Sequence, residues 1–187
     1  MSVVVVAAVL MTTVLVAGRS ADAQFDVDCA TPTQTFDASN MPADLNLTPA
    51  DVILFTGGTF TGPVNGGGAT ICVDTAATFS PSLINGQVQL FVRGTAVLPQ
   101  LAADSGALLD NEGTVTFLAP PNINGLATVI NRSTGVIAVG GANVSLGPGL
   151  VLTNDGVIDV AGSLNLNGGT VTNNATITVG GPLNISA

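Results

Sequence analysis

Five acidic residues in the second half of the chain are the side chains best suited to chemistry: Asp104, Asp110, Glu112, Asp155 and Asp159. Pairs of carboxylates hydrolyse glycosidic bonds, and the two groups of an inverting pair stand about 6.5 to 9.5 Å apart. Glu112 and Asp155 fall at the edge of that range, at about 9.6 Å, if they lie two strands apart in a parallel stack. Because neither has an evident basic partner or an aromatic sugar platform, we interpret all five as solvated edge charges and expect no catalytic site.

The same carboxylates are oxygen ligands of the kind that Ca²⁺ prefers. Asp110, Glu112 and Asp155 are the candidates, and we expect them to bind Ca²⁺ weakly at most. The Gly-Asp nonapeptide of calcium-binding β-rolls is absent from the sequence. We therefore predict neither a metal site nor a cofactor.

The composition excludes most other catalytic chemistry. The 187-residue chain has no histidine, tryptophan or tyrosine, and its three basic residues are Arg19, Arg93 and Arg132. Histidine is the commonest general base, so its absence argues against an enzyme. The net charge of −9 repels nucleic acid phosphates and anionic lipid headgroups. We expect a protein that is not an enzyme and that binds no nucleic acid.

A targeting segment opens the chain. Residues 3–17 are almost all apolar, and Ala21 and Ala23 fit a small-residue cleavage site. About 15 apolar residues are fewer than the ~20 that a spanning helix needs. We predict a signal peptide over residues 1–23, a secreted or cell-surface protein, and no membrane contact after cleavage. A retained membrane anchor is the alternative, since no basic residue precedes the apolar run.

Two cysteines, Cys29 and Cys72, follow the predicted cleavage site. In an exported protein they meet an oxidising compartment, in which a disulfide persists. We predict that they are bonded to each other. Two buried free thiols are the alternative.

A repeated motif indicates which elements position these side chains. Residues 111–117 recur as 154–160 and 173–179, a copy with a two-residue insertion spans 131–139, and a degenerate copy spans 93–98. The glycine position of the motif falls at 94, 113, 135, 156 and 175, so the period is about 20 residues. This period is typical of one coil of a β-solenoid.

Apolar residues alternate within each copy. We predict that two columns face inward: Ala96, Val115, Ile137, Ile158 and Ile177, then Leu98, Phe117, Val139, Val160 and Val179. The residues between them are mixed, as expected of an outward face. Two further apolar segments accompany each copy. The sequence therefore predicts an all-β, right-handed parallel β-helix with three short strands per coil of about 20 residues.

An asparagine and a glycine mark one corner of each coil. The predicted corner residues are Asn111, Asn131, Asn154 and Asn173, with Gly113, Gly135 and Gly156. Asparagine tolerates left-handed backbone, and its side chain can donate hydrogen bonds along a stack, so we expect a ladder. We expect the glycines to supply corners that other residues would strain.

The chain before this repeat looks different. Residues 24–67 contain Cys29 and four of the seven phenylalanines but no copy of the motif. We expect them to fold over the open first coil as an N-terminal cap, because an exposed sheet edge invites association. Residues 68–187 then form the solenoid, in about six coils, truncated or open at the C-terminal end.

Part of the sequence also resembles a known group of proteins. The Gly-Gly-Thr-Phe-Thr-Gly stretch at 57–62, the segments 68–73 and 79–81 and the later Asn-x-Gly repeats resemble the opening of secreted surface proteins from gliding bacteria. The repeats are also similar to those of haemagglutinin-like exoproteins and autotransporter passengers. The resemblance implies a parallel β-helix, an adhesin-like role at the cell surface, and a match of Cys29 and Cys72 to the paired cysteines of such chains.

We therefore predict a secreted structural or adhesive β-solenoid that acts as a stiff spacer or contact surface. Its expected partners are cell-surface glycans or other copies of itself. The alternative is a carbohydrate-binding or carbohydrate-active β-helix protein with a pectate-lyase-like fold. Two outward pairs, Thr114 with Thr116 and Thr176 with Thr178, resemble the rows of ice-binding solenoids, but the coils between them break the row. Ordinary β propensity explains these threonines.

Overall fold

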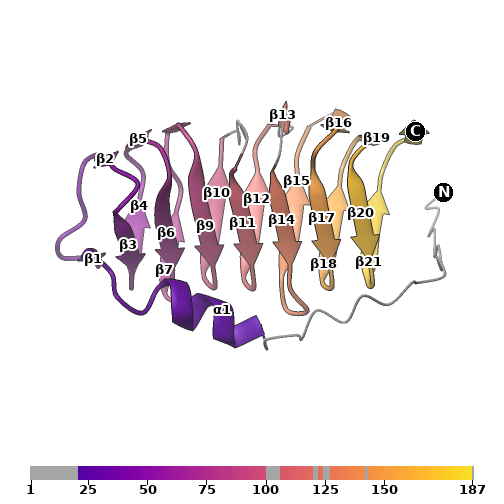
Figure 1. Ribbon diagram of the computed structural model, residues 1–187. Helices are drawn as coiled ribbons and strands as arrows, with labels where there is room; N and C mark the ends of the chain where they lie inside the picture. Colours follow the sequence, from indigo (N-terminus) through magenta and orange to yellow (C-terminus); the bar gives the residue numbers. More distant parts are fainter. Residues whose placement is uncertain (1–20, 100–105, 120–121, 124–126, 142, 187) are drawn as a thin grey trace.

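The computed structural model describes residues 21–99, 106–119, 122–123, 127–141 and 143–186. Nearly all of this is parallel β-structure, stacked into a solenoid of about 7 turns (Figure 1). The predicted fold class is confirmed. In Figure 1 the front strands run downward, the strands behind run upward and the coils advance from left to right, which is a right-handed winding.

The strands of successive coils stack along three sides of the rod. The eight-stranded side consists of β1 (Gln34–Phe36), β3 (Val52–Phe55), β6 (Ala69–Val73), β9 (Val88–Val92), β11 (Leu108–Asn111), β14 (Thr128–Asn131), β17 (Val151–Asn154) and β20 (Thr170–Asn173). The seven-stranded side consists of β4 (Gly58–Phe60), β7 (Ala77–Phe79), β10 (Thr95–Leu98), β12 (Thr114–Phe117), β15 (Val136–Val139), β18 (Val157–Val160) and β21 (Thr176–Val179).

The third side is divided into two sheets. The first consists of β2 (Leu45–Leu47), β5 (Pro63–Gly66) and β8 (Leu83–Asn85). The second consists of β13 (Asn122–Ile123), β16 (Asn143–Leu146), β19 (Ser163–Asn167) and β22 (Leu183–Ser186). All paired strands are parallel, so each coil stacks on its neighbours in the same direction.

The register agrees with the columns read from the sequence. Val115 pairs with Ile137, Ile137 with Ile158 and Ile158 with Ile177. Inward residues are buried and the residues between them are exposed or half-buried, for example along β18. A period of two along each strand therefore sets the inside and outside of the whole rod.

The solenoid begins earlier than the sequence repeat indicated. Strands β1 to β5 lie within residues 24–67 and pair in line with later coils, so most of this segment is solenoid and not a cap over it. Phe55 and Phe60 fill the interior of the second coil rather than covering an end. The early coils escaped detection because they place phenylalanine, and not the Asn-Gly motif, at the repeated positions.

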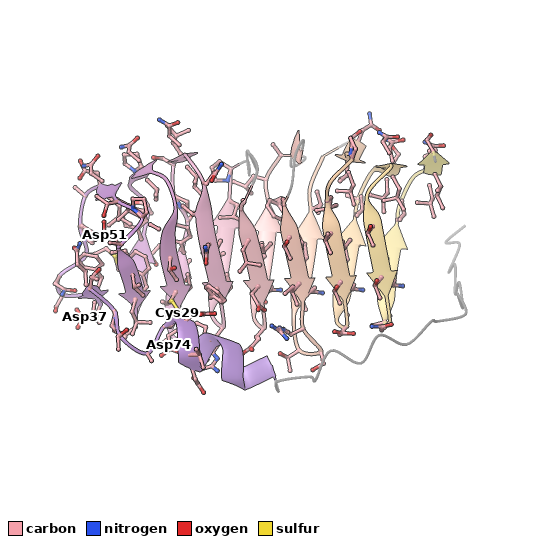
Figure 2. The ribbon with its side chains drawn as sticks, viewed as in Figure 1. Cys29, Asp37, Asp51 and Asp74 are labelled. Atoms are coloured by element: carbon pink, nitrogen blue, oxygen red, sulfur yellow. A yellow bond between two sulfur atoms is a disulfide. The ribbon has the colours of Figure 1, made fainter. Side chains whose placement is uncertain are left out.

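An irregular segment, residues 37–44, stands in front of β4 in place of a strand. A Cβ on Gly58 or Gly62 would collide with the backbone of Ala38 or Ala43, so the segment lies directly against the edge of β4. Asp37 holds a turn within it by accepting hydrogen bonds from the amide and hydroxyl of Ser39 (Figure 2). A non-strand segment at this edge blocks further strand addition there.

Helix α1 (Ala21–Asp28) lies along the outside of the rod, beneath the eight-stranded side in Figure 1. Its Phe25 packs with Cys29, Cys72 and Phe91 in a small cluster separate from the interior core. The predicted cleavage site after Ala23 falls inside this helix, and cleavage would leave residues 24–28 of it. The rest of the predicted signal peptide, residues 1–20, lies outside the described residues. No helix in the described ranges is long and apolar enough to cross a membrane.

Candidate functional site

The polar side chains gather at the corner between the eight-stranded and seven-stranded sides. One residue of each coil follows the end of its strand there, and together they form a column that we call the charged corner: Asp74, Arg93, Glu112, Arg132, Asp155 and Asn174. Backbone hydrogen bonds continue the stack through these residues. From Asp74 to Asp155 the charge alternates in sign from coil to coil, which places attractive neighbours on both sides of each arginine.

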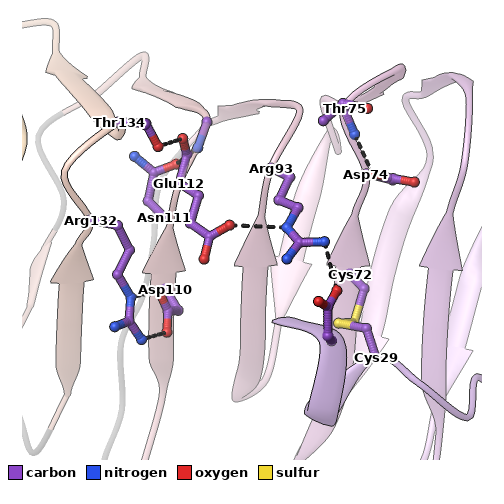
Figure 3. A network of polar contacts seen from close by, with 12 residues as sticks. Cys29, Cys72, Asp74, Thr75, Arg93, Asp110, Asn111, Glu112, Arg132 and Thr134 are labelled. Carbon is purple, nitrogen blue, oxygen red and sulfur yellow. Dashed lines mark hydrogen bonds and ion pairs between the residues drawn. A yellow bond between two sulfur atoms is a disulfide. The ribbon is translucent and has the colours of Figure 1, made fainter. Parts of the chain in front are cut away.

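Arg93 joins three parts of the chain at this corner (Figure 3). Its Nε donates to Glu112 in the next coil at 3.0 Å, and its Nη1 donates to Asp26 of α1 at 2.8 Å. Its guanidinium also lies over the Phe25 ring, 4.2 Å from the centroid. Burial lowers the pKa of Arg93, but the bonds to Asp26 and Glu112 outweigh burial and raise it. Arg93 thus fastens α1 to the rod.

Arg132 forms an ion pair with Asp110, which lies one coil earlier. Its Nε and Nη2 donate to the two carboxylate oxygens at 2.8 and 2.5 Å. These hydrogen bonds raise the pKa of Arg132 above its ordinary value, and the charges of Glu112 and Asp155 add to the effect. Asp110 is 4% exposed, so this two-pronged pairing satisfies a carboxylate that is almost completely buried.

This geometry corrects the expectation that the acids have no basic partners. Glu112 is paired with Arg93, and Arg132 stands in the column between Glu112 and Asp155. Asp155 accepts a hydrogen bond from the Asn174 side chain at 2.8 Å, while Asp159 is an exposed outward residue of β18. Asp104 lies outside the described residues. The arrangement pairs opposite charges between stacked coils: Glu112 with Arg93 and Asp110 with Arg132.

The four predicted asparagines are joined in one row beside the charged corner. Asn111 donates to Asn131 at 2.8 Å, Asn131 donates to Asn154 at 2.7 Å, and Asn154 donates to Asn173 at 2.7 Å. The same side-chain nitrogens also reach backbone oxygens on the seven-stranded side, such as those of Val136 and Val157. These bonds tie each coil to the next, and within a coil the amides of Gly113 and Gly156 donate to Asn111 and Asn154 and so hold the corner.

The backbone reason given for these corner residues was wrong. No asparagine, and no other non-glycine residue in the described ranges, has a positive φ. The glycines with left-handed φ lie elsewhere, for example Gly66 and Gly86, and not at the motif positions. Gly135 is required for space, because a Cβ there would overlap the side chains of Asn111 and Asn131. Gly113 and Gly156 face the backbone of the preceding coil in the same way.

Cys29 and Cys72 form the predicted disulfide, which rules out two free thiols. It closes a loop with a sequence separation of 43 residues and attaches the end of α1 to β6. In the chain-entropy account, closing a loop of this length stabilises the fold by about 4 kcal/mol. The bond holds α1 over the outward side chain of Phe91 and keeps that apolar surface covered.

The outer face of the seven-stranded side carries the predicted threonine row. It is longer than the sequence repeat indicated, since Thr59, Thr78 and Thr95 precede Thr114 in the same column. Val136 and Val157 interrupt it before Thr176. The face is therefore polar in the early coils and partly apolar in the late ones.

The repeated motif could predict one contact of Arg93 but not the other. The bond between Arg93 and Asp26 joins residues 67 apart in sequence, which no local pattern predicts. The pairing of Arg93 with Glu112 had a signal, since the two are 19 residues apart and occupy equivalent places in consecutive coils.

Within the described residues no group of three or more His, Cys, Asp or Glu side chains is placed to hold a metal ion. No family model, curated protein or solved structure matches this chain.

Proposed function

We propose that the protein is a secreted structural or adhesive solenoid that acts as a stiff spacer or contact surface outside the cell. The observation that supports this most strongly is the continuity of its contacts between coils. Parallel backbone hydrogen bonds join the coils along two continuous sides and two shorter sheets of the third, and the asparagine row and the Arg93–Glu112 ion pair add side-chain bonds between coils. In such a stack each coil is held by its neighbours, so the rod resists bending and local opening.

The exposed surfaces supply the contacts that this role requires. Asn184 donates to Asn165 at 2.7 Å on the third side, and Asn65 donates to Asn46 at 3.4 Å nearer the N-terminal end. Exposed amides in rows offer donors and acceptors at the spacing of the coils, which suits the hydroxyl groups of a repeating glycan. Cell-surface glycans are therefore the proposed partners, with other copies of the chain as the second class.

The first experiment recovers the protein from its own cells, measures its intact mass and records whether it is in the medium, on the surface or inside. Release or surface retention supports the spacer role, and an intracellular protein would contradict it. A mass well above 18.4 kDa, together with surface retention, would make this segment a stalk of a larger adhesin.

Glycan contact is tested separately with immobilised neutral and acidic polysaccharides. Binding should weaken when Asn165 and Asn184 are both replaced by alanine, and the control Thr114→Ala on another side should bind like the parent. Turnover of any polysaccharide by the parent, lost in Glu112→Ala with Asp155→Ala, would instead establish the carbohydrate-active alternative.

A further inference from the structure

The interior of the rod is not filled evenly along its length. Between β11 and β21 it contains an apolar cavity of about 50 Å³. Thirteen side chains line it, all aliphatic except Phe117, and they include Val129, Val139, Val144, Leu150 and Val160. Valine stands at several of these inward positions, and its short side chain leaves the space near the axis open.

The exposure of the interior side chains also differs between the early and late coils. The interior residues Phe55, Phe60 and Phe79 of the early coils are 0% exposed. The inward residues Val129 and Val139, which line the cavity, retain 7% and 6%. Both side chains point into the rod and line the cavity. Their atoms have no packing partner on that side and forgo the dispersion contacts of a filled core.

We propose that this cavity is a binding site for a compact apolar guest smaller than benzene, such as a xenon atom or a very short hydrocarbon. No polar residue lines it, so a water molecule would find none of the two to four hydrogen-bond partners that it needs, and the space stays dry. A dry apolar cavity of about 150 Å³ in another protein accepts benzene or xenon, and the present space is about a third of that volume. The site is independent of the proposed spacer role.

Xenon is the probe for this site. The full chain is titrated with dissolved xenon while amide shifts and the thermal midpoint are recorded. We expect saturable shifts on β11 to β18 and a rise in the midpoint with xenon concentration, because a guest that binds only the folded state stabilises it. No saturable shift, or shifts confined to β3 to β7, would overturn the proposal.

Two variants fill the cavity, and one control does not. Val139→Leu and Val129→Ile each add a methylene group at an inward position and should abolish the saturable xenon response. Val136→Leu lies on the same strand as Val139 but faces outward, so it should keep the response. If Val139→Leu does not fold, Val129→Ile carries the test. A response that persists in a folded, filled variant would contradict the site.

Discussion

The early coils and the late coils share one plan but are held together differently. In the early coils Phe55 contacts three other rings, with centroid distances of 5.8 Å to Phe36, 5.4 Å to Phe60 and 5.6 Å to Phe79. The late coils have an aliphatic interior with a cavity, and a buried row of asparagines takes the place of aromatic volume along one inward column. Aromatic packing and a polar ladder are thus two solutions to the same need, a continuous contact from coil to coil.

The early and late coils also differ in the elements that flank the stack. The early coils carry α1 and the Cys29–Cys72 disulfide outside the core, and the irregular segment 37–44, whose Met41 packs against the core. The late coils depend on contacts within the stack. We infer that the early coils are stabilised by the disulfide, α1 and aromatic packing, and the late coils by hydrogen bonds that recur from coil to coil. The predictions below test this difference.

The largest effect is expected from Ile158→Asp. Ile158 is an inward residue of a late coil, and an unpaired carboxylate there should cost more than about 4 kcal/mol and unfold the neighbouring coils. Denaturant unfolding with limited proteolysis measures it. The control Thr114→Asp, on the outer face, should change stability by less than about 0.5 kcal/mol. Equal losses would mean that the assignment of inside and outside is wrong.

A smaller loss is expected from Phe55→Ala, at about 4 kcal/mol, because it removes a buried ring and its three aromatic contacts. The matched variant Phe117→Ala removes the same side chain beside the cavity of the late coils. It should cost about 1 kcal/mol less, since its surroundings are already loosely packed. Thermal or denaturant unfolding of the two variants compares them, and a larger loss for Phe117→Ala would contradict the packing difference.

Substitution in the middle of the asparagine row should lower the free energy of unfolding more than substitution at its end. Asn131→Ala removes one of the two donors to the Asn154 oxygen and the acceptor of Asn111 in the row, so we expect a loss of about 2 kcal/mol. Asn173→Ala, at the exposed end, should cost about 0.5 kcal/mol or less. Hydrogen exchange of the β14 and β17 amides reports the opening. Similar losses at both positions would show that the row acts as separate bonds.

The smallest effect is expected at acid pH, at the turn that Asp51 holds in the early coils. The pKa of Asp51 is lowered from 3.8 because its carboxylate accepts hydrogen bonds from the amide and then the hydroxyl of Thr48. A lowered pKa adds stability that is present above pH 3.8 and is lost as pH falls through the value in the folded protein. The protection of the Thr48 amide, relative to its intrinsic exchange rate, should therefore fall as the pH drops below 3.8, and Asp51→Asn should remove this dependence. Unchanged protection of this amide across that pH range would contradict the role of Asp51.

The sequence predicted the coil length, the inward columns and the asparagine row of the late coils, because each depends on a short motif that recurs about every 20 residues. The glycine spacing set the coil length, the alternation after it set the inward columns, and the asparagine position set the row. The coils of residues 34–66 were missed because their inward residues, such as Phe55 and Phe60, are buried like those of later coils but belong to no copy of the motif. The contacts of α1 were missed because they depend on distant partners, as with Asp26 and Arg93.

The asparagine row also has a direction. The Oδ1 atoms of Asn111 and Asn154 accept the amides of Gly113 and Gly156 in their own coil, so each side-chain nitrogen points to the next coil. The side-chain amide dipoles are therefore aligned head to tail along the rod, with their positive ends toward the C-terminal coils. Aligned amides polarise one another, and each bond added to such a chain strengthens the others by about 10 to 30%. The row makes the rod electrically polar along its axis, so its two ends are not equivalent even where the coils repeat.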